Sequence, residues 1–518
     1  MYWADKIAKS ITDSGKFKPY WVDDMKTPSG RIHVGSLRGV VTHNLIYQAL
    51  LDLDQKATFS YVFDDHDPMD GLPVYLDKER WEKYLGQPLF SIPSPAGKSK
   101  SYAEYFAEEF REVFNQIGCK PKIIWGSELY LKGLMNAGVK KCLDKAQIVR
   151  RIYTELYHKK MPDDWYPFHV VCPKCGKIST TKVTDWDGEE VTFECKVSGL
   201  DYTQGCGLKG KISPYSGKGK FVGKLPWKVE WAVKWQVIGV TIEGAGKDHM
   251  TAGGSHEVAE QVAEKVLDYP VPYAFSHEFF LIGQRKMSSS KGLGVSAQEI
   301  SEILPPSVLR FLFIRTDYRQ AIDFDPMGTM FIPDLFDEYD RSWQAYIEGK
   351  REDLARVFVL SQITEVPAKK SVFLPRFREV AYLFQGGSES LIAYFAEKKG
   401  SSLTAEEEKI LEERIKYAKI WLGSFAPVDF KFEIKGGGKT DLSAEFIKKL
   451  IGLVNGAKSP EDLEKKIYGL IKDSKIPPKK AFPEIYQVLT GKTHGPKLAW
   501  LIWENKEKSL EIFRKLAQ

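Results

Sequence analysis

The order strand, glycine turn, helix, strand near the N-terminus constrains the fold of this chain more than any other feature. A short apolar run at 20–22 leads into a turn at 27–30, and apolar residues recur at helical spacing after His33. A second β-rich run at 57–63 ends in the acidic segment 64–67. Because parallel sheets with crossover helices begin in this order, we expect an α/β domain here.

Shifts in composition divide the rest of the chain. The segment from about 70 to 165 mixes proline-containing loops with helical stretches, and we interpret it as an insertion between two halves of the sheet. The segment at about 166–215 is rich in Gly, Cys and Thr, which is typical of a small metal-stapled module. Helical patterns dominate from about 300 onward. We therefore expect an α/β domain over 1–300 and helical domains over 301–430 and 431–518.

Positive charge is concentrated at the C-terminal end. Residues 431–518 hold 18 Lys and Arg against 11 Asp and Glu, whereas the whole chain carries a formal charge of only +6. Such an excess favours a polyanionic partner bound through phosphates, although a solvated helical surface with surplus lysine gives the same count. No basic region followed by an apolar run opens the chain, and no long apolar stretch follows, so we expect no membrane span and a cytoplasmic location.

Four of the six cysteines lie in the segment 166–215. Two residues separate Cys172 from Cys175, a spacing that lets adjacent thiolates bind one ion, and Cys195 and Cys206 follow. Four thiolates favour tetrahedral zinc, so we predict one structural Zn²⁺ site, with reduced structural cysteines as the alternative. No histidine cluster accompanies these cysteines, and nothing in the sequence indicates a catalytic zinc.

A glycine-containing segment at 27–36 joins the first strand to the first helix. Backbone N–H groups and the positive end of a helix dipole favour a phosphate at such a place, and His33 is suited to donate to it. The nucleotide-binding candidates in this segment are Thr27, Pro28, Ser29, Gly30, His33, Gly35 and Ser36. A glycine turn with a capping histidine is the alternative interpretation.

Two further segments carry candidate binding residues. The loop at 286–292 is suited to close over the β- and γ-phosphates of a nucleotide, and a flexible polar loop is the alternative. Its candidates are Lys286, Met287, Ser288, Ser289, Ser290 and Lys291. Ahead of the last strand, Gly246, Asp248 and His249 form a second nucleotide-binding candidate, in which the aspartate suits a ribose hydroxyl. For His249 alone, a buried or loop histidine is the alternative.

As a pair, the loops at 27–36 and 286–292 resemble the HIGH and KMSKS signatures of the class I aminoacyl-tRNA synthetases. Ser36 stands at the second histidine position of HIGH, and Ser289 at the fourth position of KMSKS. The chain is more specifically similar to the class I lysyl-tRNA synthetases, and this resemblance spans nearly its whole length. Its motifs lie at 3–5, 64–67, 227–235, 246–255 and 489–498.

The resemblance implies a Rossmann-type parallel-sheet catalytic domain with an inserted zinc-binding module, followed by all-α C-terminal domains. It implies a linker over 301–430 that contacts the tRNA stem and an anticodon-binding domain over 431–518. The implied substrates are ATP with Mg²⁺, L-lysine and tRNA(Lys). The implied catalytic residues are His33, Ser36, Lys286, Ser288, Ser289 and Ser290.

For the amino-acid pocket, the resemblance implies Met25, Thr27, Asp65, Trp227, His249 and His277. Met25 stands where the family has a small residue, and His277 where it has an aromatic hydroxyl. An ammonium side chain needs acceptors or an aromatic face around it. The sequence leaves open which of Asp23, Asp24, Asp65 and Trp227 supplies them.

Three other functions fit parts of the pattern. A glutamyl-type synthetase shares the helical C-terminal design, but it needs cationic residues in the amino-acid pocket. A small-molecule nucleotidyltransferase shares the His-x-Gly loop, but it has no need of a basic helical region. A catalytically silent RNA-binding paralogue fits Ser36 and Ser289.

Overall fold

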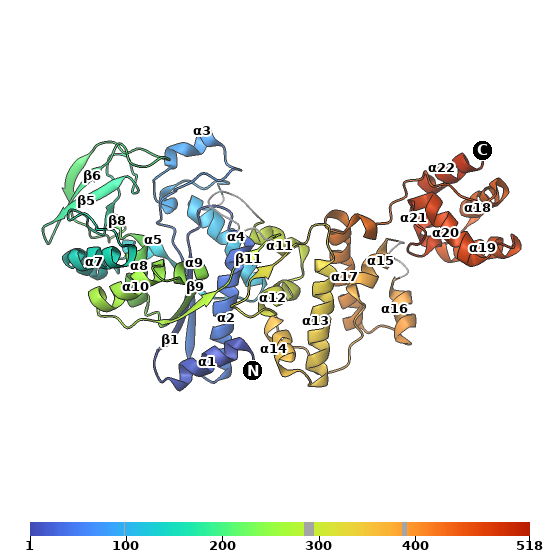
Figure 1. Ribbon diagram of the computed structural model, residues 1–518, viewed down its shortest axis with the longest axis horizontal. Coiled ribbons are helices and arrows are strands. Elements are labelled where there is room, and N and C mark those ends of the chain that lie inside the picture. Colours follow the sequence, from blue (N-terminus) through green and yellow to red (C-terminus); the bar gives the residue numbers. More distant parts are fainter. Residues whose placement is uncertain (98, 284–294, 386–390) are drawn as a thin grey trace. The chain divides into compact units, whose positions relative to one another are not determined.

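The computed structural model describes residues 1–97, 99–283, 295–385 and 391–518 (Figure 1). The chain forms two compact units, one of residues 1–324 with 349–367 and the other of residues 325–348 with 368–518. The first unit extends past residue 300, where the sequence suggested a boundary. It does so because α11 (Ala297–Ile303) packs against α4 (Tyr102–Gln116), and α12 (Pro306–Ile314) packs against α2 (Leu37–Asp52).

A five-stranded sheet forms the centre of the first unit, in the order β10-β9-β1-β2-β3. All neighbouring strands run parallel, which confirms the α/β parallel-sheet fold expected from the sequence. The strands are β1 (Tyr20–Lys26), β2 (Ala57–Phe63), β3 (Lys122–Trp125), β9 (Ile242–Gly246) and β10 (Tyr273–His277). β3 comes from within the interval 70–165, so the segment interpreted as an insertion also supplies the edge strand of the sheet.

The direction of the strand order changes at β1. β2 and β3 follow on one side of it, whereas β9 and β10 lie on the other side. Such a switch point leaves a crevice at the carboxyl ends of the strands, where open α/β sheets bind their ligands. The register across this point places Asp23 beside Glu243, so these two side chains project from the same face of the sheet.

Helices cover both faces of the sheet. α2 packs on one face, where a Cβ at Gly39 would lie 2.7 Å from Asp24 Oδ2, so the glycine permits the close approach of helix and strand. α8 (Trp227–Ile238) covers the other face, where Trp231 and Trp235 donate hydrogen bonds to Glu243. The other helices of this unit are α1 (Trp3–Asp13), α3 (Lys78–Trp81), α5 (Gly126–Leu131), α6 (Asn136–Asp144), α7 (Ala146–Tyr157), α9 (Lys247–Met250), α10 (Ser255–Val262) and α14 (Glu352–Ser361).

A small β module holds the four clustered cysteines. Its base is the antiparallel pair β4 (His169–Val170) and β8 (Gly223–Lys224). Between them, β5 (Thr181–Trp186), β6 (Val191–Cys195) and β7 (Lys209–Ile212) form a three-stranded antiparallel sheet. A separate parallel pair, β11 (Phe280–Leu281) and β12 (Ile322–Asp323), follows later in the same unit.

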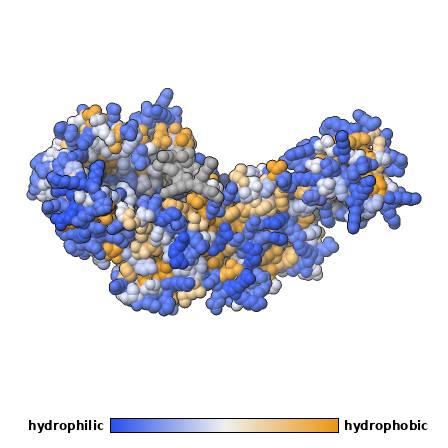
Figure 2. Space-filling model, in the orientation of Figure 1, coloured by the Kyte–Doolittle hydropathy of each residue, from blue (hydrophilic) through white to orange (hydrophobic). Residues whose placement is uncertain are grey.

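The described residues of the second unit form helices and connecting loops. The helices are α13 (Phe331–Glu348), α15 (Phe377–Phe384), α16 (Leu391–Lys399), α17 (Ala405–Ser424), α18 (Ala444–Gly456), α19 (Pro460–Asp473), α20 (Pro478–Thr490), α21 (Leu498–Glu504) and α22 (Lys506–Leu516). Leu450, Ile467, Ile485 and Phe513 belong to one buried cluster that joins α18 to α22. Across the described parts of both units, no helix is long and apolar enough to cross a membrane. On the face drawn in Figure 2, hydrophobic residues lie in patches among hydrophilic ones.

Candidate active site

A cavity of about 720 Å³ lies at the carboxyl ends of the strands, at the switch point between β1 and β9. Residues from both halves of the sheet line it. Those that the sequence predicted are Met25, Thr27, Ser29, His33, Gly35, Ser36, Trp227, Gly246, Asp248, His249 and His277. The fold thus gathers nucleotide-binding and amino-acid-binding candidates from opposite ends of the catalytic region into one cavity.

The segment 27–36 forms the wall of the cavity next to α2. Thr27 Oγ1 donates to Asp67 Oδ2 at 2.5 Å, and Val34 N donates to the carbonyl of Val295 at 3.1 Å. A short 3₁₀ turn, η1 (Val34–Ser36), then leads into α2, so that Gly35 and Ser36 line the cavity at the N-terminus of this helix. Backbone N–H groups and the helix dipole make such a position suited to a phosphate.

Some predicted residues lie elsewhere. Pro28 and Gly30 are not among the lining residues of the cavity. Asp65 is buried away from it, because its carboxylate accepts hydrogen bonds from Ser127 N at 2.7 Å and Ser127 Oγ at 2.5 Å, at the start of α5. The loop candidates Lys286, Met287, Ser288, Ser289, Ser290 and Lys291 fall outside the described residues.

Aromatic side chains form one wall of the cavity. The Trp227 ring stacks on Trp231 with centroids 6.1 Å apart, and His249 meets Trp227 edge-on at 5.7 Å. Trp227 is 44% exposed, so part of its ring is accessible. Across the cavity, burial lowers the pKa of His277 to about 3, so its ring is neutral at physiological pH. Aromatic faces suit an aliphatic chain that ends in a cation.

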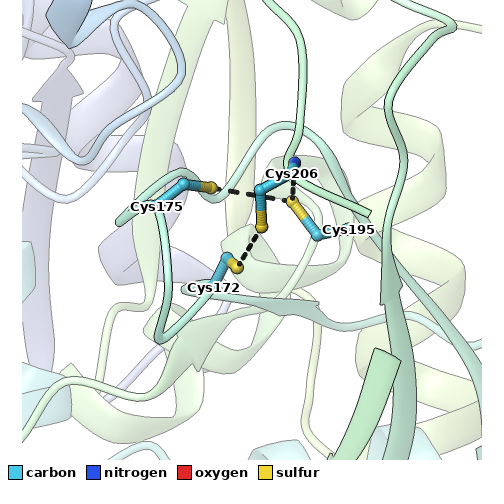
Figure 3. A group of neighbouring side chains, drawn as sticks. All are labelled: Cys172, Cys175, Cys195 and Cys206. Atoms are coloured by element: carbon cyan, nitrogen blue, oxygen red, sulfur yellow. Dashed lines mark hydrogen bonds between the residues drawn. The ribbon is translucent and has the colours of Figure 1, made fainter. Parts of the chain in front are cut away.

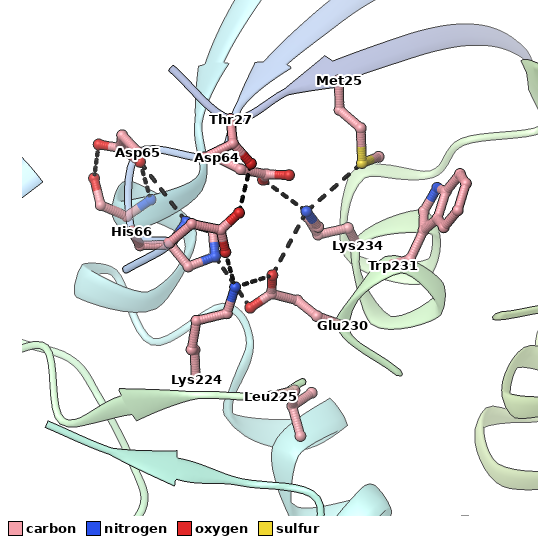
Figure 4. A network of polar contacts seen from close by, with 12 residues as sticks. Met25, Thr27, Asp64, Asp65, His66, Lys224, Leu225, Glu230, Trp231 and Lys234 are labelled. Atoms are coloured by element: carbon pink, nitrogen blue, oxygen red, sulfur yellow. Dashed lines mark hydrogen bonds and ion pairs between the residues drawn. The ribbon is translucent and has the colours of Figure 1, made fainter. Parts of the chain in front are cut away.

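A buried network of charges lies between α8 and the end of β2 (Figure 4). Lys234 Nζ lies 2.6 Å from Asp64 Oδ1 and 3.6 Å from Glu230 Oε2. Lys224 forms an ion pair with Asp67 and lies 3.0 Å from Glu230 Oε2. His66 is also part of this network, with its Nε2 3.0 Å from Glu230 Oε1.

The charged groups of the network shift one another's pKa values. Although burial disfavours the imidazolium, Glu230 raises the pKa of His66 to about 9, so His66 is charged at neutral pH. Burial likewise opposes the ionisation of Glu230, but His66, Lys224 and Lys234 hold its pKa well below the usual range. Three cations therefore face four carboxylates, those of Asp64, Asp65, Asp67 and Glu230, and Ser127 donates two hydrogen bonds to Asp65.

Comparison with known proteins assigns the family. The family model described as tRNA synthetases class I (K) matches residues 1–364. A lysine–tRNA ligase from Archaeoglobus fulgidus is 32% identical, over 97% of this chain and 97% of that protein. Lysine–tRNA ligase 1 from Methanosarcina acetivorans is 31% identical, over 99% and 98%. A lysine–tRNA ligase from Methanocaldococcus jannaschii is 32% identical, over 96% of each chain. This chain belongs to the class I tRNA synthetases (K).

In this class I synthetase, the four clustered cysteines converge as the sequence predicted (Figure 3). Their sulfur atoms all lie within 4.8 Å of one another. Cys172 and Cys206 are 3.6 Å apart and Cys175 and Cys195 3.7 Å apart, close to the spacing of roughly 3.8 Å between thiolates around tetrahedral zinc. The loop after β6 turns back so that Cys206 N donates to Cys195 Sγ at 3.3 Å, which explains how the widely spaced second pair meets.

The sequence analysis of this synthetase missed several groups at the cavity. Lys224, Lys234 and Glu243 line it, as does Asp64. Asp24, one of the four residues that the sequence left open as partners of the ammonium, also lines it. One signal was available, because the segment 227–235 is apolar except for Lys228, Glu230 and Lys234, and the last two are four residues apart. Two opposite charges at that spacing in a mainly apolar helix indicate a buried ion pair.

Proposed function

We propose that this chain is a lysine–tRNA ligase that uses ATP. The carboxylate of lysine attacks the α-phosphorus of ATP, the bond to the β-phosphate breaks, and pyrophosphate leaves. A terminal ribose hydroxyl of tRNA(Lys) then attacks the carbonyl of lysyl-adenylate and displaces AMP. The observation that carries the proposal is similarity to lysine–tRNA ligases over nearly the whole chain. The shared cavity of the nucleotide and amino-acid candidates supports it.

On the phosphate side, His33 and Ser36 would donate hydrogen bonds to the α-phosphate, next to the N-terminus of α2. Thr27, Ser29 and Gly35 would shape the same wall. Asp248 would accept from a ribose hydroxyl beside Gly246. The pyrophosphate would be bound by Lys286, Met287, Ser288, Ser289, Ser290 and Lys291. Most of the catalytic effect would come from positioning and charge stabilisation, and Mg²⁺ would be held mainly by the phosphates.

On the amino-acid side, Trp227 and His249 would cover the aliphatic part of lysine. Met25, Thr27 and His277 would complete the wall, since all three line the cavity. Direct contact with Asp65 is not part of the proposal, because Ser127 engages that carboxylate. The glutamyl alternative needs a free cation here, but Lys224 and Lys234 are both paired with carboxylates.

We assign one structural Zn²⁺ to Cys172, Cys175, Cys195 and Cys206. The converging sulfur atoms support it, and the free energy of metal binding would stabilise the module. Elemental analysis of protein prepared without chelator should find one equivalent of zinc. The double variant Cys172→Ser/Cys175→Ser should lose it and make the segment 166–215 sensitive to protease. Two equivalents, or none, would contradict the single site.

We also propose that the helical region binds tRNA, with 301–430 contacting the stem and 431–518 the anticodon. The charge excess of 431–518 supports this, because lysine contacts to phosphates make affinity fall steeply with salt. Truncation after about residue 430 should weaken tRNA binding in filter retention and flatten its salt dependence, while ATP binding is retained. Equal tRNA affinity and equal salt dependence for the full-length and truncated proteins would contradict this assignment.

ATP–pyrophosphate exchange with each of the twenty amino acids, with and without total tRNA, tests the whole proposal. Exchange with lysine alone is the expected result. Exchange with glutamate would move the assignment to the glutamyl type. Exchange with no amino acid, even with tRNA present, would favour the catalytically silent paralogue.

A further inference from the structure

If the proposed function holds, the residue that receives the side-chain ammonium of lysine should be a carboxylate at the cavity that is not already paired with a cation. Asp64, Asp67 and Glu230 lie close to the cavity, but Lys224, Lys234 and His66 already neutralise them. A second ammonium at these carboxylates would have to displace a buried cation that is already well paired. Because each of these three carboxylates already has a cation beside it, we do not place the ammonium of lysine in this network.

Two other acidic residues lie beside each other at the switch point. Asp23 on β1 is the register partner of Glu243 on β9, and both are buried, with 0% and 1% of their surface exposed. Trp231 Nε1 donates to Glu243 Oε2 at 2.9 Å, and Trp235 Nε1 donates to the same oxygen. These two bonds fix the carboxylate from the side of α8 and leave Oε1 as the oxygen that a ligand would meet.

The carboxylate of Asp23 has fewer hydrogen-bond donors than that of Glu243. Its Oδ1 accepts a hydrogen bond from Ser60, whereas its Oδ2 has no hydrogen-bond donor among the described residues. A buried carboxylate oxygen without a donor is costly unless a ligand satisfies it. The pair thus offers acceptors next to a cavity that Glu243 lines directly.

We propose that Glu243 binds the side-chain ammonium of substrate lysine, and that Asp23 is a positioning residue that supplies further negative charge. The aliphatic part of lysine would then lie along Trp231, which lines the cavity and also orients Glu243. Lys234 Nζ lies 2.6 Å from Asp64 Oδ1, so its charge is engaged by that carboxylate.

The protonation of the pair adds a measurable consequence. Burial raises the pKa of Glu243 to about 7, and burial together with Glu243 raises the pKa of Asp23. The charged groups that face the pair are Asp24 on β1, Lys234 on α8 and His256 on α10. Near pH 7 the pair therefore carries a proton in the free protein, and a bound ammonium should expel it.

The first experiment measures ATP–pyrophosphate exchange by Glu243→Gln. The KM for lysine should rise by about 30-fold or more, the effect typical of removing one partner of a buried charge pair, while the KM for ATP stays the same. Norleucine, which lacks the ammonium, serves as the comparison inhibitor, and its inhibition constant should not change. Asp23→Asn should show the same selectivity with a smaller effect. Glu264→Gln, an exposed carboxylate that does not line the cavity, is the matched control.

Several outcomes would overturn the proposal. One is equal weakening of lysine and norleucine by Glu243→Gln, which indicates a merely structural role. Another is a selective loss of lysine affinity in Asp64→Asn but not in Glu243→Gln. A wild-type protein that activates no lysine would instead refute the proposed function, so the two failures are distinguishable.

The second experiment uses the wild-type protein and does not depend on the folding of a variant. Calorimetric titration at pH 7 in two buffers of different ionisation enthalpy measures the protons released on binding. Lysine should release a fraction of a proton, and norleucine should release none. Equal proton release by the two ligands would overturn the assignment.

Discussion

The side of the cavity to which we assign the phosphates and the side to which we assign the amino acid are built on different principles. The phosphate side consists mainly of one continuous segment, 27–36, and uses glycine, backbone N–H groups and a helix N-terminus. The amino-acid side is assembled from side chains that are distant in sequence, such as Asp23 with Glu243 and Asp64 with Lys234. Chemistry shared by all members of a class fits the first design, whereas selection of one amino acid fits the second.

The largest effect should come from the phosphate side. His33→Ala should lower the rate of adenylate formation by about 10²–10³, the usual loss when one donor to a developing charge is removed. The KM for lysine should change little, because His33 belongs to the other wall. Pre-steady-state adenylate formation at saturating lysine is the measurement. A loss confined to lysine affinity would contradict the assignment of His33 to the phosphate side.

The buried network should make the stability of the amino-acid side depend on pH. The pKa of His66 rises from 6.5 to about 9 on folding, so its contribution is fully present below pH 6.5 and is lost as the pH rises through 9. The shift corresponds to roughly 3 kcal/mol of unfolding free energy. Urea denaturation at pH 6.5 and 9.5 should show this loss in the wild type and a smaller one in His66→Asn. Parallel curves for the two proteins would exclude His66 as the source.

The smallest effect should come from the aromatic wall. Trp227→Ala should raise the KM for lysine about fivefold to tenfold, since the contact of a partly exposed ring with the aliphatic part of lysine is worth about 1 kcal/mol. Trp227→Phe should recover most of the loss. Exchange kinetics at varied lysine and fixed ATP measure both variants. An unchanged KM for lysine would place Trp227 outside the amino-acid site.

The same contrast explains what could be predicted from the sequence. The parallel sheet was predicted because a β-rich run, a glycine turn and a helical pattern follow one another around His33, and the four cysteines were recognised by type and spacing. Glu243 was not predicted, because only the register of β1 with β9 shows that it lies beside Asp23. Asp65 was chosen as a pocket residue although Asp64 lines the cavity, since the sequence does not say which of two adjacent side chains at the end of a strand turns inward.

The pairing of β4 with β8 has a consequence for how this synthetase could be remodelled. The chain leaves the catalytic unit at His169–Val170 and returns beside the same point at Gly223–Lys224. A segment whose two ends are neighbours can be inserted, deleted or exchanged in one genetic step, because the order and connections of the strands in the sheet stay the same. The cysteine module is therefore a natural unit of grafting between relatives. Any replacement would have to supply a counterpart of Ile178 and Ser179, which the module contributes to the cavity.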